Sequence, residues 1–326
     1  MALSKITNDS LKDTAVHGVR NLIINGAMQV AQRGTSSSNS GIQAVDRIGV
    51  SGAWNEWIFT QEQSSDAPAG FSNSFKLSTT TAEVSLDAGD LVYINQGIEA
   101  QNLQHLKYGA SGAETCTLSF WVKSSIAGVF GISLYQDDGS YILTPTYTIN
   151  AANTWEYKTI SVSGNTLGAP ANDNGNGIRV SFIVAAGSSY NDGTSRTSWE
   201  SYSTNKFGSG HVQNGVMTTL NATFQITGVQ LEVGNTATPF EHRSYGDELA
   251  RCQRYYYTTG ADSGHGVFNA NTYGSTSFPV TMRSDPTITW LAGTATTPTS
   301  LNINPTGLYA HSTSTQGMQF NANAEL

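Results

Sequence analysis

The stretch ITGVQLEVGNTATPFEHRSYGDELARCQRYYY, residues 226–257, marks the point where a β-rich region ends and a helix begins. Its first half alternates apolar and polar side chains, as a half-buried strand does. The alternation slips by one residue at Thr227–Gly228, which predicts a β-bulge. Gly234–Asn235 then ends the strand, and the segment 238–240 (Thr-Pro-Phe) gives an extended exit. The stretch therefore predicts the closing strand of a β-structure.

The second half of the stretch is charged, although only 12% of the whole chain is, about half of the roughly 25% usual for soluble domains. Ser244 is suited to cap the start of a helix. Carboxylates follow in the predicted first turn and cations in the last turn, where the helix dipole favours each: Asp247, Glu248, Arg251 and Arg254. One apolar helix face is expected from Tyr245, Leu249, Cys252 and Tyr256. We interpret residues 243–257 as a short helical connector, a charged hinge between two charge-poor β-regions.

Upstream of this block, short runs alternate apolar and polar residues: SFKLS (74–78), TCTLSFWVKS (115–124), GVFGISLYQ (128–136), WEYKTISVSG (155–164) and GIRVSFIVAA (177–186). In the second run, Leu118, Phe120 and Val122 face one side, while Thr117, Ser119 and Trp121 face the other. No stretch of 21–233 has a sustained helical period. An antiparallel β-sandwich over residues 21–242 is therefore predicted. The loops at 36–44 and 187–215 are long enough to suggest exposed functional surface.

Downstream, residues 258–326 contain further short runs of strand type, separated by turn residues. They predict a second, smaller β-domain at the C-terminus. This region has four charged residues: Asp262, Arg283, Asp285 and Glu325. Because so little charge would leave an isolated monomer poorly soluble, we expect self-association, as a homotrimer.

Composition excludes several classes of partner. The net charge of −8 and the scarcity of Lys and Arg argue against nucleic acid as the main partner. No apolar run approaches the roughly 20 residues of a membrane span, and the N-terminus lacks a secretory signal, so we expect synthesis in a cytoplasm and no membrane insertion. The two cysteines, Cys116 and Cys252, are too few for a disulfide framework, and buried free thiols are expected.

Several segments together carry a family likeness: NLIINGAMQVAQRGTS (21–36), AVDRIGV (44–50), LSFWVKSS (118–125) and most of the opening stretch. The chain resembles bacteriophage tail fibre and virion appendage proteins with a jelly-roll like that of carbohydrate-binding modules. The resemblance covers roughly residues 1–256 and is strongest at 226–256. It implies a two-sheet jelly-roll, membership of the virion and attachment to the host surface.

The N-terminal segment 1–20 places Ile6, Leu11 and Val16 five residues apart, a spacing that fits neither a helix nor a strand. A repeated turn is indicated, similar to the short repeats at the N-terminal ends and stems of phage fibres, and a disordered terminus is the alternative. We expect this segment to anchor the chain to other tail or capsid proteins of the virion.

Modules of the jelly-roll type often hold calcium through an acidic residue just after the Asn-Gly turn. Here the matching positions are Met28 and Gln29, and a neutral amide is a weaker ligand for a hard cation than a carboxylate. We predict no metal and no cofactor.

Catalysis is not expected either. Glycosidases need two carboxylates facing each other across a cleft. The available acids lie mostly in turns, which explains them without catalysis: Asp87, Asp137, Asp138, Asp173, Asp192 and Glu200. The chain also lacks a GxSxG elbow and an HExxH pair.

Sugar recognition uses aromatic faces together with polar groups. Trp54 and Trp57 lie beside a polar loop, but the loop 187–215 offers the larger set: Tyr190, Asn191, Asp192, Arg196, Trp199, Glu200 and Tyr202. These residues are predicted to bind glycan, and the alternative is that their rings anchor the loop or a contact between subunits.

The sequence therefore predicts a non-enzymatic virion protein, a tail fibre or receptor-binding adhesin that contacts a host cell-surface glycan. A structural capsid-decoration or adaptor protein is the first alternative, and composition does not separate the two. A polysaccharide depolymerase is a further alternative, disfavoured by the missing pair of acids.

Overall fold

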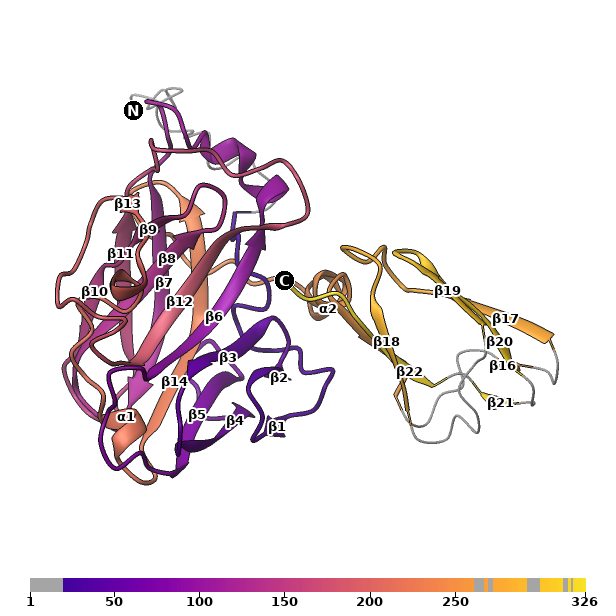
Figure 1. Cartoon of the computed structure of the whole chain (residues 1–326), viewed down its shortest axis with the longest axis horizontal. Coiled ribbons are helices and arrows are strands. Elements are labelled where there is room, and N and C mark those ends of the chain that lie inside the picture. Colours follow the sequence, from indigo (N-terminus) through magenta and orange to yellow (C-terminus); the bar gives the residue numbers. More distant parts are fainter. Residues whose placement is uncertain (1–19, 261–266, 269–271, 292–299, 313–315, 318) are drawn as a thin grey trace, which may run out of the picture.

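The computed structural model describes residues 20–260, 267–268, 272–291, 300–312, 316–317 and 319–326 (Figure 1). Two antiparallel sheets form a sandwich, and a short helix, α2 (Tyr245–Gln253), leads to smaller sheets near the C-terminus. The predicted all-β fold, with a sandwich followed by a helix and a smaller β-region, is confirmed. Within the described residues, no helix is long and apolar enough to cross a bilayer.

The six-stranded sheet contains, in spatial order, β1 (Ser36–Ser37), β4 (Ile58–Ser64), β5 (Ser74–Thr81), β14 (Thr223–Val233), β7 (Cys116–Ser124) and β11 (Glu156–Val162). The eight-stranded sheet contains β13 (Glu200–Ser201), β9 (Tyr141–Leu143), β8 (Gly128–Gln136), β12 (Asn176–Ala186), β6 (Leu91–Glu99), β3 (Ile48–Ala53) and β2 (Gly41–Val45), with β10 (Thr146–Ile149) paired to β8. Short helical turns lie at η3 (Ala100–Leu106), η4 (Thr204–Lys206) and α1 (Gly215–Thr218).

The C-terminal sheets pair β15 (Tyr256–Thr258), β22 (Phe320–Asn323) and β18 (Thr287–Trp290), then β16 (Val267–Phe268) with β21 (Gln316–Gly317), and β17 (Thr272–Ser277) with β20 (Gly307–Ser312) and β19 (Ser300–Asn304). Residues Ile6, Leu11 and Val16 lie outside the described residues. The domain boundaries at 20, 242 and 257 stay predictions.

The main core lies between the two large sheets. Phe120 of β7 is fully buried, and its ring meets Phe182 of β12 edge-on, with centroids 4.9 Å apart. Leu118 and Val122 are buried beside it, and Trp121 lies on the opposite, outer face of the same strand. The predicted alternation along β7 is therefore confirmed, as is the bulge, because the pairing of β14 with β7 shifts register between Thr227 and Gln230.

One expectation near the N-terminus is wrong, because the predicted loop 36–44 holds β1 and the start of β2. The run NLIINGA, residues 21–27, forms no strand. Asn25 instead adopts a left-handed backbone with φ 59° and is fully buried. Its side-chain Oδ1 accepts hydrogen bonds from the backbone N–H groups of Gln29 (2.9 Å) and Val30 (3.0 Å). The turn is therefore closed by a side chain and not by hydrogen bonds between paired strands.

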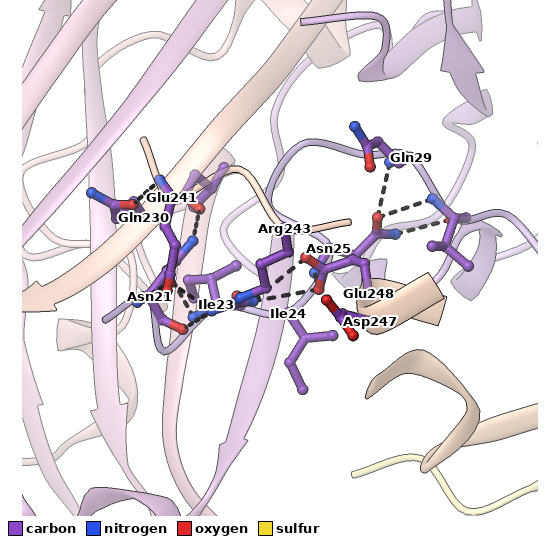
Figure 2. A network of polar contacts seen from close by, with 12 residues as sticks. Asn21, Ile23, Ile24, Asn25, Gln29, Gln230, Glu241, Arg243, Asp247 and Glu248 are labelled. Atoms are coloured by element: carbon purple, nitrogen blue, oxygen red, sulfur yellow. Dashed lines mark hydrogen bonds and ion pairs between the residues drawn. The ribbon is translucent and has the colours of Figure 1, made fainter. Parts of the chain in front are cut away.

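The helix α2 begins as predicted, because Ser244 Oγ accepts a hydrogen bond from the backbone N–H of Asp247 at 3.2 Å. Its buried face matches the prediction at Cys252 and Tyr256, which are buried, but not at Tyr245, which is 57% exposed. Glu248, which was not predicted there, is buried as well. A carboxylate is buried here because Glu248 Oε1 accepts the backbone N–H of Asn25 at 2.6 Å (Figure 2).

The charged block fastens the first described residues to the end of the sandwich. Arg243 is nearly buried, donates to the backbone oxygens of Ile23 (3.1 Å) and Asn21, and pairs with Glu241 at 3.0 Å (Figure 2). Glu241 Oε2 also accepts the backbone N–H of Asn21 at 2.7 Å. These contacts favour a fixed joint over the predicted hinge.

The C-terminal residues return to the sandwich beside α2 (Figure 1). Glu325 pairs with Arg33 at 3.0 Å and with the fully buried Arg47. The Arg47 guanidinium also lies 3.5 Å from the centre of the Tyr255 ring. Both cysteines are buried and free, as predicted.

Candidate functional site

The long loop between β12 and β14 folds over the outer face of the eight-stranded sheet. Phe207 of the loop is buried against Tyr93 of β6, with ring centroids 4.9 Å apart. Tyr202 lies against Tyr135 of β8, also at 4.9 Å. Aromatic side chains of the loop therefore pack against aromatic side chains of the sheet over this face.

A cavity of about 290 Å³ remains between the loop and the sheet. Its walls include four tyrosines, one phenylalanine and one arginine: Tyr93, Tyr135, Tyr190, Tyr202, Phe207 and Arg179. Arg179 of β12 is directly opposite Tyr135 in the ladder. We call this recess the tyrosine cavity. It brings together Tyr190 and Tyr202, two of the residues predicted from the sequence, with three aromatic residues and an arginine that were not predicted.

Polar groups in the tyrosine cavity are available to a ligand. The Arg179 side chain is 29% exposed and pairs at 3.5 Å with Asp137. The Tyr93 hydroxyl is protonated at neutral pH and can donate a hydrogen bond, and burial raises its pKa further. The hydroxyls of Tyr190 and Tyr202 hold no hydrogen bond within the described part of the chain. Apolar ring faces and hydrogen-bonding groups therefore share one recess.

Trp199 does not belong to this recess. Its side chain is 8% exposed, its indole N–H donates to the Ser163 backbone oxygen at 2.7 Å, and its ring meets Tyr108 edge-on at 5.9 Å. A ring held on its edge and faces by protein has no face left for a sugar. Trp199 anchors the loop, which is the alternative considered for this set of residues.

The predicted polar residues organise the loop and do not line the cavity. Arg196 binds both oxygens of Asp192 (3.1 and 2.5 Å) and also pairs with Glu200. These hydrogen bonds hold the pKa of Asp192 well below its usual range. Asn191 Oδ1 accepts the Gly193 backbone N–H at 2.9 Å. Residue types alone did not separate such internal pairing from ligand binding.

A second recess lies on the outer face of the six-stranded sheet, as a groove of about 940 Å³. Trp121 of β7 and Tyr157 of β11 form part of its floor, with ring centroids 5.4 Å apart. Phe71, Phe240 and His242 line its far wall. We call this recess the sheet groove. The outward position of Trp121 in the LSFWVKSS run was the signal that could have found it.

Of the other tryptophans considered as sugar platforms, Trp57 belongs to the core and Trp54 is partly buried against it. Trp57 is 2% exposed and donates its indole N–H to Thr79 Oγ1 at 2.9 Å. Trp54 packs edge-on against it at 5.5 Å.

The acids weighed for catalysis make local contacts. Asp138 accepts the Ala171 backbone N–H at 2.8 Å, and Asp173 accepts that of Gly175 at 2.8 Å. Among the described residues that line the tyrosine cavity and the sheet groove there is no Asp or Glu. The described residues also contain no cluster of three His, Cys, Asp or Glu suited to a metal ion.

No family model matches the chain, and no curated protein matches it. Among solved structures, the chain is similar to the enzymatically active domain of tailspike protein 4 of bacteriophage CBA120, with 14% identity and a TM-score of 0.35. That match covers 66% of this chain and 21% of the tailspike chain, about a fifth of its length.

It is also similar to the family 11 carbohydrate-binding module of Clostridium thermocellum Lic26A-Cel5E, with 11% identity, a TM-score of 0.31, and 63% and 98% of the two chains covered. A third match is TmCBM61 in complex with β-1,4-galactotriose, with 12% identity, a TM-score of 0.29, and 66% and 99% covered. At these identities and TM-scores the matches carry no functional argument.

Proposed function

We propose that the protein is a non-enzymatic saccharide-binding protein whose ligand enters the tyrosine cavity. The observation that carries the proposal is the meeting of Tyr135 and Tyr202 beside Arg179, in a recess formed by four strands of the eight-stranded sheet and the long loop. Pyranose rings present apolar C–H faces to aromatic rings, and their hydroxyls accept and donate hydrogen bonds. The tyrosine cavity offers partners for both surfaces of a sugar.

The absence of acids among the described residues lining this cavity supports binding without hydrolysis, because a glycosidase needs two carboxylates at the scissile bond. Its volume suits one end or one branch of a glycan better than a long stretch of chain. We therefore favour recognition of a terminal or branching sugar on a host surface.

The test compares the full chain with the double variant Tyr135→Ala/Tyr202→Ala on an array of bacterial surface polysaccharides. Removing two sugar-facing rings is expected to weaken binding at least about tenfold. The matched control is Tyr245→Ala, which removes a 57% exposed tyrosine from α2 and is expected to bind normally. Equal binding by the folded double variant, or release of reducing sugar by the wild type, contradicts the proposal.

In the virion we assign the protein the role of a tail fibre or receptor-binding adhesin, joined to tail or capsid proteins through residues 1–20 and self-associated as a trimer. The support is the resemblance of the sequence segments to phage appendage proteins. Deleting residues 1–20 is expected to abolish incorporation into particles while glycan binding persists. Normal incorporation of the truncated chain would remove the anchor, and incorporation without any glycan binding by the intact chain would favour the capsid-decoration or adaptor role.

A further inference from the structure

We propose that the sheet groove is a second saccharide site, specific for a neutral oligosaccharide, which goes beyond the function assigned to the tyrosine cavity. Its floor consists of cross-strand pairs of β7 and β11: Trp121 with Tyr157, Ser119 with Thr159, and Thr117 with Ser161. Alternate residues along a strand are about 6.8 Å apart, so the pairs cover about 14 Å. An aromatic platform therefore continues into a row of hydroxyl groups along one straight floor.

Most polar side chains of this floor form no hydrogen bond within the described residues; Thr117 is the exception, because its hydroxyl donates to the Gly234 backbone oxygen at 2.8 Å. Elsewhere in the chain, the indole N–H groups of Trp57, Trp155 and Trp199 donate to protein acceptors at 2.9, 3.2 and 2.7 Å. Trp121 has no such acceptor within the described residues. The same holds for the side-chain hydroxyls of Ser119, Tyr157, Thr159 and Ser161, again within the described chain. Open donors and acceptors beside an exposed aromatic platform match a ligand that is itself covered with hydroxyls.

The lining also indicates the charge of the ligand. No Lys, Arg, Asp or Glu occurs among the described residues of the sheet groove. The nearby cation Lys123 is already paired with Asp66, whose pKa is lowered mainly by that hydrogen bond. An acidic sugar would lose its hydration here without gaining a countercharge, so a neutral oligosaccharide is favoured.

The far wall of the sheet groove is held in place by buried polar contacts. Glu232 of β14 is 1% exposed and accepts both the backbone N–H (2.8 Å) and the hydroxyl (2.6 Å) of Thr238. At the bulge, Gly228 has φ 60°, and a Cβ there would lie 2.6 Å from the Phe71 ring. Phe71 in turn meets Phe240 at 5.1 Å. A wall fixed before binding lowers the entropy cost of capturing a flexible ligand.

The test uses the full chain labelled with 5-fluorotryptophan, with the Trp121 resonance assigned from the Trp121→Phe variant. The probes are maltohexaose, cellohexaose, xylohexaose and mannohexaose at millimolar concentration, with trigalacturonate as the anionic comparison. At least one neutral probe is expected to shift the Trp121 resonance and leave those of Trp57 and Trp199 in place, and trigalacturonate is expected to shift none. Tyr157→Ala is expected to weaken the response about tenfold, whereas Tyr245→Ala leaves it unchanged.

The titration is repeated with Tyr135→Ala/Tyr202→Ala, so that the proposals for the tyrosine cavity and for the sheet groove are tested independently. A Trp121 shift that survives in this variant supports a separate site, whatever becomes of binding at the tyrosine cavity. The proposal is overturned if no neutral probe moves the Trp121 resonance. It is also overturned if Trp121→Phe dissociates an oligomer in sedimentation, because the sheet groove would then be a contact between copies of the chain.

Discussion

At the scale of single residues, His211 shows how burial sets chemistry. It is 2% exposed, and its Nδ1 accepts the backbone N–H of Gly131 at 3.1 Å, so the neutral ring carries its proton on Nε2. Burial lowers the pKa of His211 to about 4. The free imidazole has a pKa of about 6.5. The folded chain therefore excludes a proton that the unfolded chain binds between these two values.

This difference predicts acid sensitivity. As the pH falls from about 6.5 to about 4, the unfolded state gains the proton first, so the free energy of unfolding decreases, by roughly 3 kcal/mol in total. Denaturant unfolding of the wild type and of His211→Asn at pH 7 and pH 4 measures this contribution. The asparagine Oδ1 takes the position of Nδ1 as acceptor for Gly131 but does not titrate, so the variant should lose less stability than the wild type over this range. The same loss in both proteins would show that His211 does not contribute.

The residue scale also explains why the residues that line the tyrosine cavity were only partly predictable. The sequence pointed to an aromatic loop, and Tyr190 and Tyr202 do line a cavity. Their partners Tyr93 and Tyr135 sit on strands more than fifty residues away in the chain, and only the folded sheet brings them beneath the loop. Trp199 carries the same kind of side chain in the same loop, yet a single acceptor at Ser163 helps turn it into an anchor.

At the scale of elements, the sequence predicted those features correctly that depend on residues close together in the chain. The Ser244 cap and the bulge at Gly228 depend on neighbours in sequence, and both were predicted. The burial of Glu248 on α2 was not, because its carboxylate serves an N–H of Asn25, which is 223 residues earlier in the chain. Such long-range pairing of a charge with the backbone leaves no periodic pattern.

The contacts of Arg243 lead to a prediction for the joint between α2 and the first described residues. Arg243→Ala leaves the backbone oxygens of Asn21 and Ile23 without their donor and should destabilise the protein by about 3 kcal/mol. Denaturant unfolding and proteolysis between residues 20 and 30 report the change. The control Arg251→Ala removes a cation of α2 that forms no ion pair within the described residues. Equal stability of the two variants would contradict the fixed joint.

At the scale of the whole molecule, the sandwich and the smaller sheets are joined by buried ion pairs as well as by the covalent chain. Arg254 binds both oxygens of the buried Glu99 at 2.8 Å, and Glu325 pairs with Arg33 and Arg47. The sequence predicted the order of these regions because each has its own strand pattern. It did not predict the connection, because the pairing of Glu325 with Arg47, 278 residues apart, depends on how the chain end returns.

The return of the chain end predicts a coupled unfolding of the two regions. Glu325→Ala strands the buried Arg47 and should lower the unfolding free energy by about 3 kcal/mol, with faster hydrogen exchange in β15 and β22. Asp285→Ala, at an exposed carboxylate of the same region, serves as the control and should exchange like the wild type. If Glu325→Ala also exchanged like the wild type, the ion pairs of Glu325 would contribute nothing to holding the regions together.

Saccharide binding in the tyrosine cavity is tested most directly by a crystal structure of the full chain with the polysaccharide fragment that binds it best on the array. We predict density for a sugar ring against Tyr135 and Tyr202, with its hydroxyls within hydrogen-bonding distance of Arg179 or Tyr190. A bound fragment elsewhere with an empty tyrosine cavity, at a concentration that saturates binding in solution, would contradict the assignment.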